Sequence, residues 1–206
     1  MATAPSAALI HKTLFLWVAL LAVPLLGERL SGWQVAGLGV LVVGQFLLQP
    51  PSAWGWGSGE ILMLIATLLW AFETILAKKV LAGTSARTAA LGRMGVGALV
   101  MWTFLALTGR AGGAVSLIGP QGFWVVITSL FLMGYVWTWY SALKAAPAVL
   151  VTSVLTLGAI ITIVLAAIVE GKGATTPQIA GMLLLALGAA AFAWRSPRLS
   201  QAAEAV

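Results

Sequence analysis

Long apolar runs, separated by short stretches that contain Gly, Pro or charged residues, make up most of this chain. The runs lie at 5–27, 33–49, 60–80, 86–109, 121–143, 146–169 and 178–195. Each is close to the ~20 residues with which an α-helix crosses the hydrocarbon core of a bilayer. The pattern predicts an all-α, polytopic membrane protein with about seven transmembrane helices. Gly112-Gly113 and Gly119-Pro120 are expected to bracket a loop between the fourth and fifth helices.

Composition supports this fold class. Hydrophobic residues are 61% of the chain and charged residues only 8%, whereas soluble domains carry about 25% charged residues. A surface this poor in charge cannot face water, so the lipid bilayer is the expected surrounding. The net charge of +6 would suit nucleic acid, but the basic residues are scattered between apolar runs, so no nucleic-acid partner is expected.

Several kinds of chemistry are excluded by the residues available. The chain has no cysteine, no aspartate and a single histidine, which argues against disulfides, thiolate chemistry and a clustered metal site. It contains no HExxH motif, no paired aspartates and no nucleophile–base pair in sequence. We therefore expect no enzyme activity, no cofactor and no metal, and an intramembrane enzyme is the weakest functional hypothesis.

The charges in the loops predict the orientation. Seven helices place the termini on opposite sides of the membrane. One side then carries seven basic residues, namely Arg29, Lys78, Lys79, Arg87, Lys144, Arg195 and Arg198, and the other carries Arg110 and Lys172. The richer side is expected in the cytoplasm, with the N-terminus outside and the C-terminus inside. The predicted location is the plasma membrane, or the inner membrane if the protein is bacterial.

The first run has a competing interpretation as a signal peptide, because His11-Lys12 precedes the apolar stretch 13–26. A signal peptide keeps its positive end inside, which would invert every later loop against the charge distribution. The run also has a near copy later in the chain. A membrane helix is therefore favoured.

An internal repeat relates the first two runs to the last two. Pro5 precedes Glu28 by 23 residues, and Pro147 precedes Glu170 by the same 23. Each copy continues with a glutamine and two glycines seven residues apart: Gln34, Gly37 and Gly44 in the first, Gln178, Gly181 and Gly188 in the second. The copies lie five helices apart, and an odd number makes them cross the membrane in opposite directions. This predicts an inverted repeat, which is common in secondary transporters.

The repeat suggests how the chain is divided. Residues 1–49 correspond to the last two helices of a truncated first copy, 60–195 to a complete second five-helix copy, and 196–206 to a cytoplasmic tail. A five-helix unit would need three further helices before Met1. The inverted five-helix repeat is therefore predicted to be incomplete in this sequence.

The chain resembles the drug/metabolite transporter superfamily, of the EamA type. The resemblance rests on Gly27-Glu28 with Gln34 and Gly37, on Ala142-Leu143-Lys144 with Ala146-Pro147, on Gln178 with Gly181, and on Trp70-Ala71 with Lys78-Lys79. It extends over the whole chain, aligned with the last seven of the family's ten helices, and Val169 replaces the glycine expected before Glu170. The resemblance implies transport of small metabolites by alternating access.

Charged residues within the spans are functional candidates by default. Lys12 lies in the first helix and either contacts the solute or snorkels to the interface. Glu73 and Arg93 lie ten residues on either side of Gly83 and are predicted to meet at one depth. Glu73 would then bind a cationic solute or a proton, or the pair would only orient two helices. Arg93 could instead snorkel without touching Glu73.

Other polar and small residues have two interpretations each. Tyr135 and Trp139 share a helix face and suit an aromatic or amphipathic solute, or face lipid. Thr152 and Thr156 line a cavity or bond back to their own helix. His11 is expected to be packed or interfacial, Glu28 and Glu170 to bind loop amides or a nearby arginine, and the glycines at 92, 95, 97, 181 and 188 to pack helices. The predicted solute-binding residues are Lys12, Glu73, Arg93, Tyr135, Trp139, Thr152 and Thr156.

The leading functional hypothesis is transmembrane transport of a small organic metabolite or drug-like solute, with export (efflux) favoured, by the chain or by a transporter of which it is a fragment. The alternative is a non-transporting membrane scaffold or assembly partner. A homodimer, or a partner that supplies the missing helices, is consistent with either. In the DNA upstream of Met1, an in-frame start with three further apolar spans would favour a truncated transporter. A stop codon directly upstream would favour a genuine short form.

Overall fold

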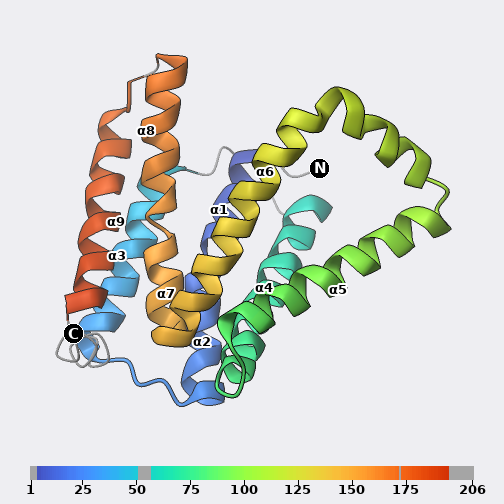
Figure 1. Ribbon diagram of the computed structural model, residues 1–206. Coiled ribbons are helices and arrows are strands. Elements are labelled where there is room, and N and C mark those ends of the chain that lie inside the picture. The colour runs from blue at the N-terminus through green and yellow to red at the C-terminus, as the bar shows by residue number, and fades with distance from the viewer. Residues whose placement is uncertain (1–3, 51–56, 172, 195–206) are drawn as a thin grey trace, which may run out of the picture. The chain divides into compact units, whose positions relative to one another are not determined.

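A computed structural model describes residues 4–50, 57–171 and 173–194, and their regular structure is entirely helical (Figure 1). The helices are α1 (Ala4–Lys12), α2 (Leu14–Leu26), α3 (Gly32–Leu48), α4 (Ser58–Leu81), α5 (Ala86–Leu107), α6 (Ala111–Ala145), α7 (Ala148–Leu155), α8 (Gly158–Glu170) and α9 (Thr176–Trp194). The all-α fold class predicted from the sequence is confirmed.

Six segments are long and apolar enough to cross a membrane. They are Ser6–Leu26, Ser58–Leu81, Ala86–Leu107, Gly119–Ala145, Ala148–Glu170 and Thr176–Ala193. The remaining predicted span, 33–49, corresponds to α3, which is apolar but has only 17 residues. The chain is therefore a polytopic membrane protein, and its apolar helices follow the predicted runs.

The prediction of a loop at 112–120, between the fourth and fifth helices, is wrong. The turn is confined to 108–110, where Gly109 has a positive φ of 70°, and α6 then continues from Ala111 through Pro120. Pro120 removes one helical hydrogen bond, and Figure 1 shows α6 bending in its first part. The helix persists because, among apolar residues, leaving it would strand backbone groups without hydrogen-bond partners.

Contacts divide the chain into two compact units. The first unit comprises Met1–Leu76 and Ala146–Val206, and the second comprises Ala77–Ala145. This division follows packing in space and groups the two predicted repeat copies at 5–44 and 147–188 in one unit.

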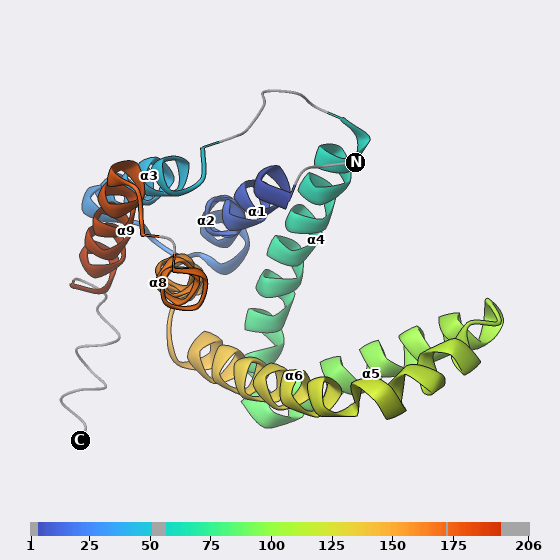
Figure 2. The same cartoon turned by 90° about the horizontal axis from the view of Figure 1, so that it is seen from above.

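In the first unit, α3 and α9 pack side by side and antiparallel (Figures 1 and 2). A Cβ atom added to Gly37 would lie 3.5 Å from the Gly188 carbonyl oxygen, and one added to Gly44 would lie 3.1 Å from that of Gly181. Glycines thus let the two backbones approach, as small residues do between membrane helices. The packing predicted for Gly181 and Gly188 is confirmed, whereas no atom of the described residues lies within 4 Å of such a Cβ atom at Gly92, Gly95 or Gly97.

Both α3 and α9 begin with the same polar motif, which explains the glutamine of the repeat. The Ser31 N–H donates to Gln34 Oε1 over 2.9 Å, and the Gln34 N–H donates to Ser31 Oγ over 3.3 Å. The Thr175 N–H likewise donates to Gln178 Oε1 over 2.9 Å. These bonds satisfy backbone donors that a helix start leaves open.

In the second unit, α5 and α6 form a helical hairpin. The last residues of α4 contact the end of this hairpin at which α5 begins and α6 ends. Lys78 Nζ donates to the Leu143 carbonyl over 2.5 Å, and Lys144 Nζ donates to the Thr84 carbonyl over 2.9 Å. Two lysines therefore hold the end of α4, the loop after it and the end of α6 together.

The orientation of the chain is a first testable prediction. A reporter fused after Val206 is expected to be active in the cytoplasm, because the predicted topology places seven basic residues on the same side as the C-terminus. The paired measurement is the activity of a periplasm- or exterior-specific reporter at the same position. Exterior activity at residue 206 would contradict both the charge argument and the predicted direction of the repeat.

Candidate functional site

The first membrane segment of the chain is interrupted within its span. α1 ends at Lys12 and α2 begins at Leu14. At the interruption the Thr13 N–H bonds to the Ile10 carbonyl over 3.1 Å, three residues back instead of four. Thr13 Oγ1 also donates to the Ile10 carbonyl over 2.6 Å, and it accepts from Trp17 Nε1 over 3.0 Å. The helix therefore changes its hydrogen-bond pattern within the candidate membrane span Ser6–Leu26.

A second interruption occurs between α7 and α8. α7 ends at Leu155 and α8 begins at Gly158, and the N–H groups of Thr156 and Leu157 bond three residues back, over 3.2 and 3.0 Å. Pro5 and Pro147 are 142 residues apart, so this break lies within two residues of the position equivalent to Thr13. Discontinuous helices of this kind form the solute sites of several secondary transporters.

A stacked aromatic pair lies beside the first interruption. The rings of His11 on α1 and Trp70 on α4 are 4.6 Å apart between centroids, with an interplanar angle of 23°. Trp70 Nε1 is buried and has no hydrogen-bond partner among the described residues. Buried indole N–H groups normally donate to an acceptor, so this one could meet an acceptor on a solute. Lys12, half-buried, immediately follows His11.

Further buried polar atoms of the first unit have no hydrogen-bond partner within the described ranges. They include both side-chain amide atoms of Gln45 on α3 and the hydroxyl of Ser153 on α7. Gln45 is 3% exposed and Ser153 is 0% exposed. Buried polar groups are normally paired with protein, water or a ligand. Ser153 is also the repeat equivalent of His11, 142 residues away.

The two predicted threonines are buried, and their hydroxyls bond back to the helix. Thr152 Oγ1 donates to the Ala148 carbonyl over 2.9 Å, and Thr156 Oγ1 donates to the Ser153 carbonyl over 2.6 Å. Back-bonding, one of the two interpretations of these residues, is therefore present. Each hydroxyl oxygen keeps lone pairs that can still accept a bond, so solute contact remains a prediction.

The remaining predicted residues fall in both units. Glu73 is half-buried on α4 in the first unit, and Arg93 is exposed on α5 in the second, so their ion pair stays a prediction. Tyr135 and Trp139 share a face of α6, as predicted: their rings stack at 6.2 Å with an interplanar angle of 20°. Their contact with a solute stays a prediction.

Glu28 holds the start of one interrupted helix. Its Oε1 accepts from the Ala148 N–H over 2.6 Å and its Oε2 accepts from the Val149 N–H over 3.2 Å, across 120 residues of sequence. The carboxylate thus binds the positive end of α7, where a helix favours negative charge. The structural role predicted for Glu28 was binding to loop amides or to a nearby arginine, and the amides that it binds are instead the first two of helix α7.

Glu170 does not occupy the same local position. Gly27, with φ 67°, precedes Glu28, whereas Gly171, with φ 69°, follows Glu170, which is the last residue of α8. The replacement of glycine by Val169 thus coincides with a later helix end.

Sequence reasoning missed the His11–Trp70 stack and the buried Ser153 and Gln45. The only sequence signal was that His11, the single histidine, stands within an apolar span beside Lys12. Contact with Trp70, 59 residues away, has no local pattern. Serine and glutamine in an apolar helix can face any direction, and only packing shows that these two are enclosed.

Interrupted membrane helices that carry enclosed polar groups are typical of polytopic transporters. Comparison with known families matches residues 57–194 to the EamA-like transporter family. The chain belongs to the EamA-like transporter family, which confirms the resemblance to the drug/metabolite transporter superfamily.

Solved structures support the same fold. One, described as the crystal structure of a protein, has a TM-score of 0.64 and 19% sequence identity, and the match covers 96% of this chain and 70% of that one. At this identity the likeness concerns the fold alone. No match was found among curated proteins.

Proposed function

We propose that this protein exports a small organic metabolite by alternating access, with the solute held beside the interrupted helices α1/α2 and α7/α8. The observation that carries the proposal is the pair of interruptions at nearly equivalent repeat positions, each next to enclosed polar side chains. Family membership supports membrane transport, and the direction and mechanism are our inference.

The contacts between α3 and α9 support the inverted repeat that alternating access would use. Gly37 and Gly44 of the first copy correspond to Gly181 and Gly188 of the second. In the structure Gly37 faces Gly188 and Gly44 faces Gly181. The first glycine of each copy thus faces the second glycine of the other copy. A two-fold axis that relates two antiparallel helices produces this pairing, and such an axis would lie in the membrane plane. Superposition of 5–44 on 147–188 about an axis along the membrane normal would contradict it.

The side chains at the first interruption favour an aromatic anion as the solute. Lys12 supplies a positive charge, and the His11–Trp70 stack supplies a flat apolar surface with an indole donor. A carboxylate would form a charge-assisted bond to Lys12, which is stronger than a neutral one. Glu73 is proposed to bind the coupling proton or a cationic part of the solute, with Arg93, Tyr135, Trp139, Thr152 and Thr156 as further contacts.

A transport assay tests the proposal. Liposomes with the purified full chain are loaded with aromatic carboxylates, aromatic amino acids and uncharged indole, and loss of each is followed by mass spectrometry. We expect the carboxylates to leave faster than from protein-free liposomes. Lys12→Met should slow them about tenfold, because a charge-assisted bond contributes about 1.5–3 kcal/mol.

Arg110→Gln is the matched control, because Arg110 lies in the α5–α6 turn, far along the sequence from either interruption. It should leave the rates unchanged. If folded protein moves no member of the mixture, the transport proposal fails for these solutes and the scaffold alternative gains. If Lys12→Met and Arg110→Gln slowed transport equally, Lys12 would not be a solute-binding residue.

A further inference from the structure

The second unit is strongly basic. Residues 77–145 contain six basic residues and no acidic residue. Four of the six, namely Lys78, Lys79, Arg87 and Lys144, lie where α4 ends, α5 begins and α6 ends. The bonds from Lys78 and Lys144 to carbonyls of this region show that these ends meet. Positive charge is thus concentrated at one end of the α5–α6 hairpin, on the side predicted to face the cytoplasm.

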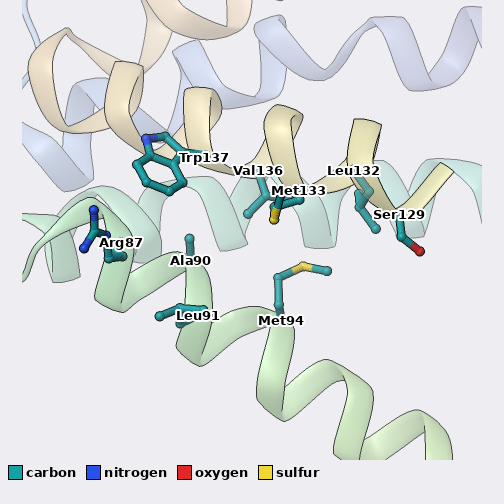
Figure 3. Close-up of a pocket in the computed structure, with 9 residues that line it drawn as sticks. All are labelled: Arg87, Ala90, Leu91, Met94, Ser129, Leu132, Met133, Val136 and Trp137. Carbon is teal, nitrogen blue, oxygen red and sulfur yellow. The ribbon is translucent and has the colours of Figure 1, made fainter. Parts of the chain in front are cut away.

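An apolar groove begins at this basic end and runs between α5 and α6 (Figure 3). Its volume is about 380 Å³, and its walls include Leu91 and Met94 from α5 and Leu132, Met133 and Val136 from α6. Arg87 to Met94 is seven residues, so the groove extends on the order of 10 Å along the helices at 1.5 Å per residue. It can hold part of a hydrocarbon chain lying along the hairpin.

Arg87 stands at the mouth of the groove. Its guanidinium carbon lies 5.1 Å from the centre of the Trp137 ring, a cation–π contact between the two helices. Figure 3 shows both side chains at the same end of the groove. The ring orients the guanidinium but uses none of its five N–H donors, which match the oxygens of a phosphate.

We propose that this groove binds an anionic phospholipid, with its phosphate at Arg87 and one acyl chain along Met94 and Met133. Charge complementarity favours this occupant: the basic end, in a unit without any acidic residue, attracts an anion, and the apolar groove beside it accommodates a hydrocarbon chain. A free phosphate would leave the groove uncovered, and a neutral lipid would leave the basic end without counter-charge. Basic pockets between membrane helices on the cytoplasmic side bind acidic headgroups in this way.

Native mass spectrometry of the full chain in a non-ionic detergent tests the proposal. Phosphatidylglycerol and phosphatidylcholine with identical acyl chains are added separately, and inorganic phosphate is added in a third series. We expect phosphatidylglycerol to be retained at least about fivefold more tightly than phosphatidylcholine, the effect of one basic side chain near a membrane surface. Arg87→Gln should remove most of this preference, and Arg87→Lys should keep most of it.

Two further variants separate charge from groove. Arg110→Gln removes a basic residue at the opposite end of the hairpin and should leave the preference unchanged. Met133→Trp fills the groove and should weaken retention of both lipids while Arg87 remains, which also covers the case in which Arg87→Gln fails to fold. Equal retention of the two lipids, an equal effect of Arg110→Gln, or displacement of phosphatidylglycerol by equimolar phosphate would overturn the proposal. None of these outcomes depends on whether the chain transports a solute.

Discussion

Gly181→Ala is expected to destabilise the packing of α3 on α9 more than a methyl group added at any other glycine of these two helices. The new Cβ atom would lie 2.6 Å from Leu48 Cδ1, 2.8 Å from the Gly44 carbonyl oxygen and 2.9 Å from the Leu48 backbone nitrogen. Two of these atoms belong to backbone, so a side-chain rotation cannot relieve the clash. We expect a loss of about 2–3 kcal/mol, at the upper end of overpacking, measured by thermal unfolding in detergent.

Gly39→Ala is the matched control, because Gly39 lies in the partner helix α3 and no atom of the described residues lies within 4 Å of an added Cβ atom there. It should be neutral or stabilising by up to about 1 kcal/mol, from helix propensity. Leu48→Ala should not rescue Gly181→Ala, since the backbone atoms remain. Gly188→Ala should cost less, because its two nearest atoms, at 2.9 Å, belong to the Leu41 side chain. Equal stability of the Gly181 and Gly39 variants would show that the backbones do not approach as described.

Glu28→Ala is expected to cost about 2 kcal/mol of stability, because two N–H groups at the start of α7 lose a charged acceptor. The same change should weaken the link between α2 and α7 and raise amide hydrogen exchange at Ala148 and Val149. Thermal unfolding and hydrogen–deuterium exchange measure the two effects on one sample.

Two variants control for this experiment. Glu28→Gln keeps one acceptor oxygen but loses the charge, so it should cost roughly half as much as Glu28→Ala. Glu60→Ala removes an exposed carboxylate that accepts from the Gly57 N–H over 3.1 Å at the start of α4, and it should cost under about 1 kcal/mol. If Glu60→Ala lowered the stability as much as Glu28→Ala, the bond of Glu28 to α7 would contribute no more stability than a local bond at a helix start.

Much of the fold follows from local patterns. Apolar run length located the membrane helices, since only a helix satisfies its own backbone in lipid. The repeat spacing marked Gln34, Gln178 and the glycines of α3 and α9, and the structure gives them roles in helix capping and close packing. The loop predicted around 112–120 is absent because glycine and proline end helices mainly in water, where the freed backbone groups can hydrogen-bond to solvent. In lipid those groups have no such partner, so the helix continues.

The candidate site was predicted less completely. Helical spacing predicted that Tyr135 and Trp139 share a face of α6, and the structure confirms this. Contact of Lys12, Tyr135 or Trp139 with a solute stays a prediction. The sequence marked Thr13 only as a residue within a span, and the helix break there depends on bonds that its hydroxyl makes with Ile10 and Trp17. The breaks at Thr13 and Thr156 were not predicted, because the runs 5–27 and 146–169 each continue through the break at the length of a single membrane helix.

By itself the sequence determined what depends on short separations: the membrane as solvent, the helices, the family resemblance and the repeat. Tertiary structure alone decided what depends on distant partners. The stacking of His11 on Trp70, the burial of Gln45 and Ser153 and the bond from Glu28 to α7 all depend on such partners. The groove beside Arg87 does so as well. The physical reason is that apolar helices in lipid have no hydrophobic preference for one neighbour over another, so packing shape and a few polar bonds choose the partners.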